Sequence, residues 1–479
     1  MWWLEEAMAH DAGRPCPPLA GTTRVDVCIV GGGYTGLWTA IELAEQAPGL
    51  RVAIVERGAC GFGASGRNGG WATGWHDELD ALIARFGREE GLRLAARSAW
   101  AIERIEAFAA EHGIECRLRQ CGAVKAAEQP WQVDRWKPAL RACQATGRGA
   151  RYEEVSGDLI RARTGSPLPI AGVRQTDGAS LQPALLTRGL RRAALKLGVR
   201  IYEATPMIAL DRGRPAVVHT PAGCLRAERV VLATGAWIGE VRGLRRATVP
   251  VGSYIVATEP LGERISSLGW ADGELLGDCR LMVHYAQVSV DGRIVFGRGG
   301  GPLGPCGRVL PAHFHDPRAI GEVRDDFRRW FPSLAGARIT HGWGGPVDRA
   351  PGHLPFVGAQ GDHDEVLYGA GFSGNGVAPS ALVGRILGRM CLGIADEDTR
   401  SPLAAGPPAY LPPEPLRSAG GAALRAVIGR QEQAEERGRR PHGAAVVRRL
   451  IATTVPRMLD PRTRREPCGR AGDARVAGE

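Results

Sequence analysis

The chain has 479 residues, with 61 Lys or Arg against 51 Asp or Glu and a net charge of +10. Gly supplies 67 positions and Pro 33, together about 21%, and 44% of residues are apolar, values that exclude disorder throughout the chain. A chain of 479 residues is expected to form two joined domains with appendages, because single hydrophobic cores stop growing at smaller sizes.

The expected cellular location follows from targeting and membrane signals that we do not find in the sequence. Residues 1–6 have no basic region followed by an apolar run, as a secretory signal would. The longest uncharged stretch, 366–384, holds five glycines and is typical of a loop entering a helix, not of a membrane span. Eleven cysteines without a Cys-x-x-Cys pair argue against a disulfide framework and structural zinc. We expect a cytoplasmic protein without metal, and attribute the His313 and His315 spacing to chance.

A strand, glycine loop, helix and second strand open the chain. They are strand 25–30, the loop Gly31-Gly32-Gly33-Tyr34-Thr35-Gly36, a helix from Leu37, and strand 51–55. Gly31 permits a tight turn, Gly33 lets the backbone approach a pyrophosphate, and Gly36 lets the helix pack on the strand. The helix N-terminus offers N–H groups to phosphates, and Glu56 is placed to accept hydrogen bonds from a ribose. The unit predicts a dinucleotide site.

Two further glycine-rich segments indicate which dinucleotide binds. Residues 57–70 follow Glu56 where a nicotinamide dehydrogenase would continue to a third strand, and their many N–H groups suit an extended ligand. Strand 366–368 leads through Gly-rich residues 369–376 into a helix at 377–392. Its N-terminus would face an isoalloxazine, which gains negative charge when it is reduced. These segments favour a flavin.

The middle of the chain predicts two kinds of sheet. Strands are expected at 199–210, 217–220 and 229–232, and then at 252–258, 281–290 and 293–297. The third ends on Thr234 and Gly235, which would turn tightly beneath the cofactor. The last three alternate, as an inserted antiparallel sheet would. Another helical block is expected at 77–111, on the other side of the glycine loop.

The predicted fold class is α/β: a discontinuous Rossmann-like FAD-binding domain with an inserted substrate domain of antiparallel β-sheet plus helices. The expected division is an N-terminal extension at 1–24, the FAD-binding domain at 25–76, 150–249 and 338–400, the substrate or cap domain at 77–149 and 250–337, and a C-terminal helix with an Arg-rich tail at 401–479. Residues 411–479 hold 14 Arg against 8 acidic residues, with a helix expected at 421–440. We interpret this segment as solvated and outside the enzyme, and Glu435 and Glu436 as a solvated helix face.

Five motifs together carry a family resemblance. They are the loop at 31–37, Gly63-Ala64-Ser65-Gly66-Arg67-Asn68-Gly69-Gly70, Ala233-Thr234-Gly235-Ala236-Trp237, Gly345-Pro346-Val347-Asp348-Arg349-Ala350-Pro351, and Gly371-Phe372-Ser373-Gly374-Asn375-Gly376. From Asp26 to Gly393 the chain resembles the D-amino-acid-oxidase-like superfamily of FAD-dependent oxidoreductases. It looks closest to the branch with γ-glutamylputrescine oxidases and putative aminophosphonate oxidoreductases.

The resemblance implies a set of FAD contacts. In chain order these are Gly31, Gly33, Tyr34, Thr35, Gly36, Glu56, Arg57, Ala64, Ser65, Gly66, Arg67, Asn68, Met207, Thr234, Gly235, Gly371, Phe372, Ser373, Gly374, Asn375 and Gly376. The first loop and Glu56 would hold the ADP half, Met207 would meet the adenine, and Arg67 and Asn68 would approach the flavin ring. Some relatives attach flavin through a Cys or His where this chain has Gly345 and Arg67. We therefore expect noncovalent FAD.

The resemblance also implies the chemistry. A C–H bond next to an amine nitrogen delivers hydride to the flavin, and the imine hydrolyses in water. O2 then reoxidises the flavin to give H2O2, or an electron carrier replaces O2. The expected substrate is a small amine or amino acid, and zwitterionic or phosphonate-bearing amines are included. The sequence leaves the oligomeric state open.

Candidate residues for the substrate face come from the inserted sheet and the loops beside it. Arg298 would clamp a carboxylate or phosphonate with two hydrogen bonds, or is a surface arginine. His284 and Tyr285 point to opposite faces of one strand, so at most one is expected to face the ligand. Trp343, between glycines, stands near the ring or in the core, and Asn68 completes the set. Arg349 faces the flavin or ties down its own loop.

Two other functions remain open at the sequence level. One is a tailoring oxidoreductase that acts on a larger amine in secondary metabolism. The other is an FAD module of an RNA-modifying enzyme, supported only by the basic tail, so no nucleic-acid partner is expected.

Overall fold

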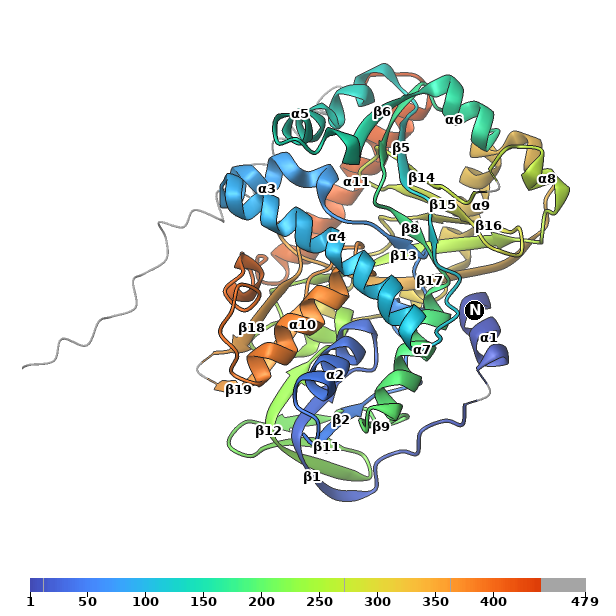
Figure 1. The fold of residues 1–479 in the computed structure, drawn as a ribbon. Helices are drawn as coiled ribbons and strands as arrows, with labels where there is room; N and C mark the ends of the chain where they lie inside the picture. Colours follow the sequence, from blue (N-terminus) through green and yellow to red (C-terminus); the bar gives the residue numbers. More distant parts are fainter. Residues whose placement is uncertain (12, 271, 362, 441–479) are drawn as a thin grey trace, which may run out of the picture.

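Residues 1–11, 13–270, 272–361 and 363–440 are described by the computed structural model of this chain. Two β-sheets, each with its own helices, form two halves of the molecule (Figure 1). The helices are α1 (Trp2–His10), α2 (Tyr34–Gln46), α3 (Leu79–Phe86), α4 (Arg88–Glu111), α5 (Lys137–Ala145), α6 (Gly157–Thr164), α7 (Pro183–Lys196), α8 (Glu263–Ser266), α9 (Pro317–Trp330), α10 (Pro379–Cys391) and α11 (Leu416–Glu436). The mixed α/β fold agrees with the predicted class.

The first sheet is mostly parallel and carries the predicted nucleotide-binding unit. Its strands, in order, are β18 (Phe356–Gln360), β19 (His363–Ala370), β12 (Gly223–Leu232), β1 (Gly21–Val30), β2 (Val52–Val55) and β9 (Arg200–Tyr202), and the strands β10 (Ala209–Asp211) and β11 (Ala216–Thr220) join it along the first part of β12. Val30 pairs with both Val55 and Leu232, and Leu232 pairs with Tyr368. The carboxyl ends of four strands are thus aligned, so the loops that follow them meet at one edge.

Helix α2 is held tightly against this sheet. Every residue from Tyr34 to Leu43 is buried, because the sheet lies on one side and α10 and α7 pack on the others. Gly384 of α10 allows this close approach, since a Cβ there would lie 2.4 Å from the Cβ of Trp38. The apolar residues that predicted a helix therefore form a core between layers.

The second sheet has eight strands and one parallel pair. Its strands, in order, are β17 (Ile339–Arg349), β13 (Val249–Thr258), β16 (Ile294–Arg298), β15 (His284–Val288), β14 (Leu275–Asp278), β5 (Ala123–Ala127), β7 (Ala171–Gln175) and β6 (Tyr152–Ser156). Only β14 and β5 pair in parallel. Helix α9 covers one face, where Phe296 of β16 packs against Phe327, Trp330 and Phe331. A small third sheet contains β3 (Trp71–Ala72), β8 (Ala179–Ser180) and β4 (Arg119–Gln120).

The strand pairing departs from the expected division in two places. Strands β6 and β7, expected in the FAD-binding part, pair with each other and join β5 in the second sheet. Strand β17 pairs along almost its full length with β13, so the second sheet reaches as far as Arg349. These pairings join residues far apart in the sequence, and local patterns carry no signal for them.

Two predicted elements have different bounds in the structure. The strand expected at 199–210 is divided into β9 and β10, because Ala204 adopts φ 50° and Pro206 follows it. Helix α11 begins at Leu416 and ends at Glu436, where Gly438 at φ 68° reverses the backbone. The Arg-rich tail from 441 lies outside the described residues.

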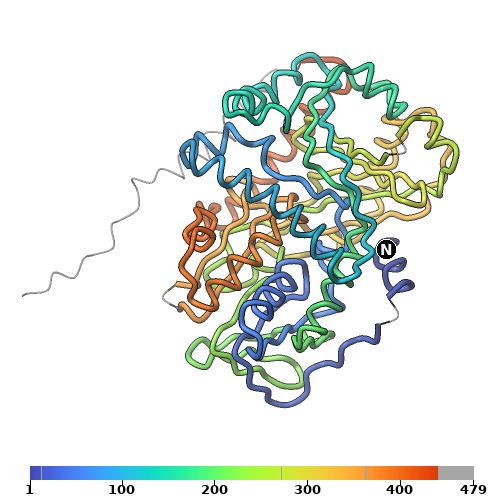
Figure 2. The backbone as a smooth tube through the Cα atoms, viewed as in Figure 1, coloured from blue at the N-terminus to red at the C-terminus, as the bar shows by residue number. Residues whose placement is uncertain are grey.

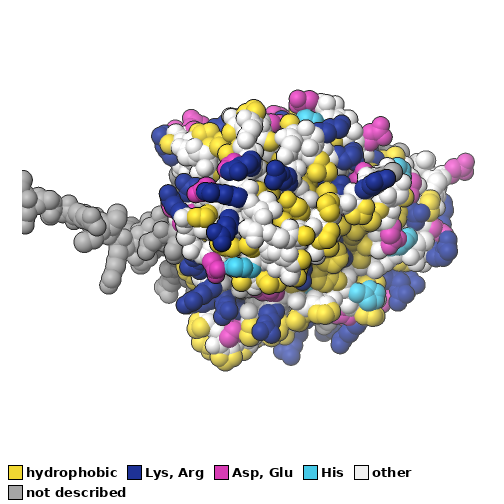
Figure 3. Space-filling view, turned by 90° about the horizontal axis from the view of Figure 1, so that it is seen from below, with side chains coloured by type: hydrophobic (Ala, Val, Ile, Leu, Met, Phe, Trp, Pro, Cys, Tyr) yellow, Lys and Arg dark blue, Asp and Glu magenta, His cyan; other side chains and the backbone are white. Residues whose placement is uncertain are grey.

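The outer surface adds two observations. From α1 the chain runs around the outside of the first half before it enters β1 (Figure 2). On the face seen in Figure 3, Lys and Arg side chains are spread among acidic and apolar ones and form no single continuous patch. Within the described part of the chain, no helix has both the length and the hydropathy to cross a membrane.

Candidate active site

A cavity of about 1330 Å³ lies between the carboxyl edge of the first sheet and the second sheet. Its walls come from the loops after β1, β2, β12 and β19, from β13 and β17, and from α11. Small-molecule pockets usually measure about 300 to 1000 Å³. The cavity therefore has room for a dinucleotide together with a substrate.

The first glycine loop brings the N-terminus of α2 to the cavity. Gly33, Tyr34 and Thr35 line the wall, and the Tyr34 N–H donates to Ser65 Oγ at 2.9 Å. A Cβ on Gly33 would lie 2.9 Å from the same oxygen, so a side chain there would have to displace the Ser65 hydroxyl that Tyr34 N–H bonds. Glu56 also lines the cavity and accepts from Gly32 N and Gly58 N, both at 2.8 Å. Burial raises the pKa of Glu56 despite these two bonds.

The second loop places Arg67 and Asn68 on the cavity wall. The Arg67 guanidinium lies 4.9 Å from the Phe62 ring and 4.7 Å from the Phe314 ring, and its Nε donates to Phe62 O at 2.7 Å. Burial lowers the pKa of Arg67 to about 10. The Asn68 amide donates to Ala64 O at 3.1 Å and accepts from Gly70 N at 2.8 Å. Its side chain therefore shapes the loop.

The indoles of Trp343 and Trp3 each donate a hydrogen bond to the backbone of this loop. Trp343 Nε1 donates to Arg67 O at 2.9 Å, and Trp3 Nε1 donates to Asn68 O at 3.1 Å. The two rings meet edge to face with centroids 6.4 Å apart, and Trp3 is only 1% exposed. Helix α1, expected only as an extension, is therefore part of the structure that supports the cavity wall.

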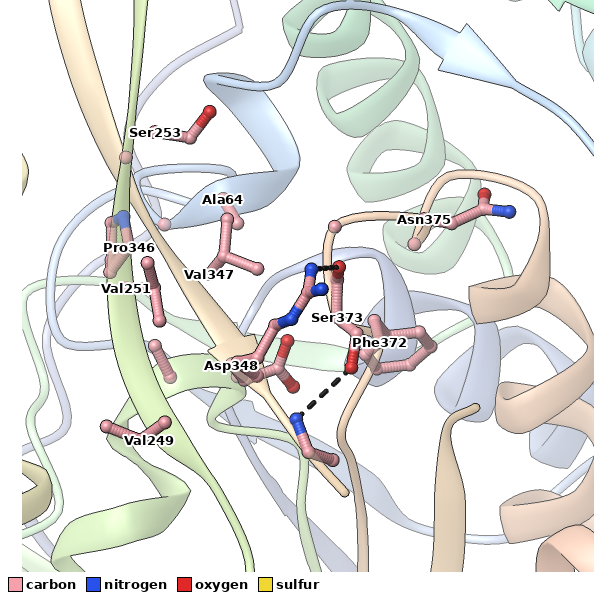
Figure 4. A pocket seen from close by; sticks show the side chains of 18 of the residues that line it. Ala64, Val249, Val251, Ser253, Pro346, Val347, Asp348, Phe372, Ser373 and Asn375 are labelled. Atoms are coloured by element: carbon pink, nitrogen blue, oxygen red, sulfur yellow. Dashed lines mark hydrogen bonds between the residues drawn. The ribbon is translucent and has the colours of Figure 1, made fainter. Parts of the chain in front are cut away.

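The third glycine-rich loop, 371–376, is fastened to the end of β17. Asp348 Oδ2 accepts from Gly371 N at 2.7 Å, and burial raises the pKa of Asp348 to about 6. Ser373 accepts twice: its carbonyl from Arg349 Nη1 at 3.1 Å and its hydroxyl from Ala350 N at 3.1 Å (Figure 4). Arg349 thus ties down the loop at 371–376 and not its own loop, and it also lines the cavity.

The cavity has the features that a dinucleotide site requires. Thr234 Oγ1 lines it, is buried, and has no hydrogen-bond partner within the described residues, so a bound ligand would satisfy it. The predicted FAD contacts that reach the cavity wall include Arg57, Met207, Gly235, Phe372, Gly374, Asn375 and Gly376. The residues present therefore fit FAD.

Three predicted contacts lie behind the wall. A Cβ on Gly36 would lie 2.0 Å from Gly31 O, and one on Gly66 would lie 2.3 Å from Gly61 O. Gly371 has φ 85° and packs under the Phe356 ring. These glycines allow close backbone packing and are not among the residues that line the cavity.

The candidate substrate residues divide between the two faces of the second sheet. Tyr285 lines the cavity, and its hydroxyl is 2.8 Å from Ser253 Oγ. His284, Arg298 and Trp343 are absent from the lining, so none of the three takes the substrate-facing alternative that we considered for it. Because side chains alternate along a strand, His284 and Arg298 point toward α9, where both bond Asp326, at 3.0 and 3.1 Å. The indole N–H of Trp343 is already used in its hydrogen bond to Arg67 O.

The buried His284 predicts a pH-dependent stability. Burial alone lowers its pKa, but Asp278, 2.6 Å from Nδ1, and Asp326 outweigh burial and raise the pKa from 6.5 to about 9. The folded protein therefore holds a proton that the unfolded chain releases near pH 6.5. This stabilisation is complete below pH 6.5 and is lost as pH rises toward 9, so the free energy of unfolding should fall across that window.

Denaturant unfolding at several pH values measures this effect, with His284→Gln as the variant. The variant should lose the decline between pH 6.5 and 9. His219→Gln is the control, because His219 pairs with Asp211 at an exposed site. Equal slopes for wild type and His284→Gln would contradict the prediction.

Two parts of the cavity wall were missed by sequence reasoning. One is a group of charged side chains, Asp77, Glu78 and Lys125, which line the wall together with Arg349, Tyr152 and His353. Lys125 is one of only three lysines in the chain, which is the one signal that marked it. The other is α11, which contributes Leu424 and Ile428 to the wall. Glu435, expected on a solvated face, is 1% exposed and paired with Arg135.

Comparisons with known proteins agree with this geometry. Residues 26–390 match the model of the DAO family, described as FAD dependent oxidoreductase. A probable oxidoreductase, OrdL, of Rhizobium meliloti (strain 1021) is 30% identical over 406 residues, covering 82% of this chain and 89% of the relative. Gamma-glutamylputrescine oxidoreductase of Escherichia coli (strain K12) is 28% identical over 386 residues, covering 80% and 87%.

A solved structure shares the fold. Glycine oxidase from Geobacillus kaustophilus superposes with a TM-score of 0.65 at 21% identity, covering 80% of this chain and 98% of the other. The chain belongs to the DAO family of FAD-dependent oxidoreductases, and FAD is its cofactor.

The Trp3 bond predicts that the N-terminal helix supports FAD retention. Trp3→Phe keeps an aromatic ring but leaves the Asn68 carbonyl without this donor, at a cost of about 1 kcal/mol. We expect a lower melting temperature and faster loss of flavin during desalting. Trp136→Phe is a matched control, since it removes an indole bond to Glu154, and neither residue lines the cavity. Equal flavin retention in both variants would rule out a role for Trp3 in holding the loop.

Proposed function

We propose that this enzyme oxidises a C–N bond of an amine or amino acid and passes the electrons to O2 or to an electron carrier. When bound, FAD supplies the acceptor for a hydride from the carbon next to the nitrogen, and the imine product hydrolyses in water. The proposal is supported by the relative that is a gamma-glutamylputrescine oxidoreductase and by a cavity with room for a substrate beside the cofactor.

The observation that carries the proposal is the composition of the part of the cavity wall formed by β13, β15 and β17. Apolar Val251, Ile255 and Val347 line this part of the wall together with Tyr285, and charged side chains also line the cavity. Apolar side chains would exclude water from the reacting carbon, and charged ones would orient a polar amine. Tyr285 keeps its proton, because burial raises its pKa to about 12, and it would act as a hydrogen-bonding group.

The residues that line the cavity also suggest which part of FAD each of them would hold. We propose that Gly33, Thr35 and Glu56 hold the ADP half, with the helix dipole of α2 favouring the phosphates. Arg67 and the loop at 371–376 would stand beside the flavin ring, where positive charge stabilises the reduced form.

Anaerobic flavin reduction tests this function. FAD-loaded protein is mixed with primary amines, secondary amines, amino acids and aminophosphonates, and the oxidised-flavin absorbance is followed. We expect at least one C–N compound to bleach the flavin and to yield the matching carbonyl product with ammonia or an amine. α-Hydroxy acids are the comparison class, and bleaching by these alone, or by no compound, would reject the proposal.

We also propose that FAD is held without a covalent bond. No cysteine is found among the described residues that line the cavity, and the position near Gly345 offers no nucleophile. Acid precipitation should leave the protein colourless and the flavin in solution. Yellow precipitate would contradict this.

A further inference from the structure

Four charged side chains come together on one part of the cavity wall. Asp77 and Glu78 belong to the 3-10 turn His76–Glu78, Lys125 to β5, and Arg349 to the end of β17. The turn precedes α3, whereas β5 and β17 are at different positions of the second sheet, so only the tertiary fold unites them. With Glu78 ionised, their charges sum to zero.

Two of the four charges neutralise each other. Lys125 Nζ forms an ion pair with Asp77 Oδ2. Burial favours the neutral amine, but the charge and hydrogen bond of Asp77 outweigh it and raise the pKa of Lys125. This pair is complete within the protein and needs no ligand.

Glu78 and Arg349 are not paired in this way. Within the described part of the chain, the Glu78 carboxylate makes no hydrogen bond or ion pair, although it lies at the cavity wall. Burial, and then the neighbouring charge of Asp77, raise its pKa to about 7. Arg349 Nη1 donates to Ser373 O, and among residues 1–11, 13–270, 272–361 and 363–440 the guanidinium has no second acceptor, so its other donors can serve a ligand.

Of the other charges that act on Glu78, those of Asp77 and Lys125 are paired with each other, and Asp80 does not line the cavity. Arg349 and burial lower the pKa of His353 to about 3, so His353 is neutral at physiological pH. Glu78 and Arg349 sense each other's charge, but no ion pair joins them. The cavity therefore presents a separated negative and positive group.

We propose that Glu78 and Arg349 bind the two charges of a zwitterion, an ammonium at the Glu78 carboxylate and a carboxylate or phosphonate at the Arg349 guanidinium. A ligand with one charge would leave the other protein group unpaired in a largely buried site, which is costly. A zwitterion pairs both groups, and a guanidinium suits a planar carboxylate. This inference rests on the proposed function, since it names the substrate class of the same site.

Two sources of the zwitterion share this chemistry. The ammonium can be the reacting amine of an α-amino acid, or it can belong to an amino-acid group at the far end of a longer amine. Both require Glu78 and Arg349, and the choice of ligands separates them.

Calorimetric binding to the FAD-loaded protein, kept anaerobic, tests the proposal. Butylamine, putrescine and 4-aminobutyrate share a four-carbon chain but carry one, two and balanced charges, and norvaline adds an α-amino acid. We expect at least one of the two zwitterions, 4-aminobutyrate or norvaline, to bind at least about tenfold more tightly than butylamine or putrescine. This factor is equivalent to about 1.4 kcal/mol in binding free energy. Preference for norvaline identifies a reacting α-amino acid, and preference for 4-aminobutyrate identifies a distant charge.

Variants assign the two contacts. Glu78→Gln and Arg349→Gln should each reduce the zwitterion preference to less than about threefold, whereas Asp80→Asn should keep it, because Asp80 is two residues from Glu78 but does not line the cavity. If Arg349→Gln loses flavin through the Ser373 loop, Arg349→Lys keeps the charge and should retain part of the preference.

Two results would overturn the inference: equal binding of butylamine and the zwitterions, or a wild-type preference in Glu78→Gln. Calorimetric binding does not require the substrate to be oxidised. The test of this inference can therefore fail independently of the flavin-reduction test of the proposed function. Zwitterions that bind through Glu78 without bleaching the flavin would reject the proposed reaction alone. Bleaching by simple amines with no dependence on Glu78 would reject this inference alone.

Discussion

Replacing Gly36 with valine is expected to abolish FAD retention. A Cβ at this position would lie 2.0 Å from the Gly31 carbonyl oxygen and 3.2 Å from Ile29 Cγ2. The Gly31 backbone cannot give way easily, because a Cβ there would itself meet Ala233 O at 2.4 Å and its φ is 113°. Helix α2 would have to move away from β1, at a cost of about 1 to 3 kcal/mol or more, and its N-terminus would leave the cavity wall.

The measurement is the ratio of flavin to protein absorbance after desalting, together with the melting temperature. Gly149→Val is the control, since the nearest atom to a Cβ there is 3.7 Å away and the backbone needs no positive φ. The control should retain flavin at the wild-type ratio. A fully loaded Gly36→Val protein with unchanged melting temperature would show that the helix and strand can separate without disturbing the site.

Arg280→Met is expected to destabilise the protein by about 3 to 5 kcal/mol, because it leaves buried carboxylates without their positive partner. The Arg280 side chain is 1% exposed. It contacts Glu128 at 2.8 Å, Glu436 of α11 at 2.5 Å and Asp278 at 3.4 Å. Glu128 and Asp278 are themselves 3% and 0% exposed, so water cannot replace the lost charge.

The same substitution should loosen α11. This helix is attached to the loop between β14 and β15 through Glu432, which accepts from Met282 N at 2.8 Å, and through Glu436, which pairs with Arg280. Glu435 attaches it to Arg135. Hydrogen exchange across 416–436 should become faster in Arg280→Met. Since Leu424 and Ile428 line the cavity, we also expect weaker substrate binding.

An exposed ion pair provides the matched control. Arg51 pairs with Asp26 at 2.5 Å, but the two side chains are 50% and 28% exposed, so Arg51→Met should cost no more than about 1 kcal/mol. Denaturant unfolding compares the two variants. The deficit of Arg280→Met should shrink in acid, where the freed carboxylates become protonated, and a deficit independent of pH would point to lost packing in place of lost charge pairing.

Local patterns were sufficient for the first half of the fold. Gly31, Gly33 and Gly36 stand between a strand and a helix, and the spacing of a few residues already restricts the backbone. The same holds for the loop at 371–376 before α10. Such signals lie within about thirty residues, so the sequence predicts both the loops and the ligand that they surround.

The substrate side depended on pairings between distant segments. His284 and Tyr285 are neighbours, yet only the register of β15 in the second sheet decides that Tyr285 faces the cavity and His284 faces α9. A shift of one residue would exchange them. The sequence pattern of the strand alone is consistent with either His284 or Tyr285 facing the cavity.

The sequence by itself therefore determined the family, the cofactor and the glycine loops, because these depend on short stretches whose geometry few other residues allow. Only the tertiary structure decided that Asp77, Glu78, Lys125 and Arg349 share one wall and that α11, which we had placed outside the enzyme, forms part of it. The physical reason is that charges and helix faces act through space, and their neighbours are set by sheet register and by buried ion pairs between segments as far apart as Arg280 and Glu436.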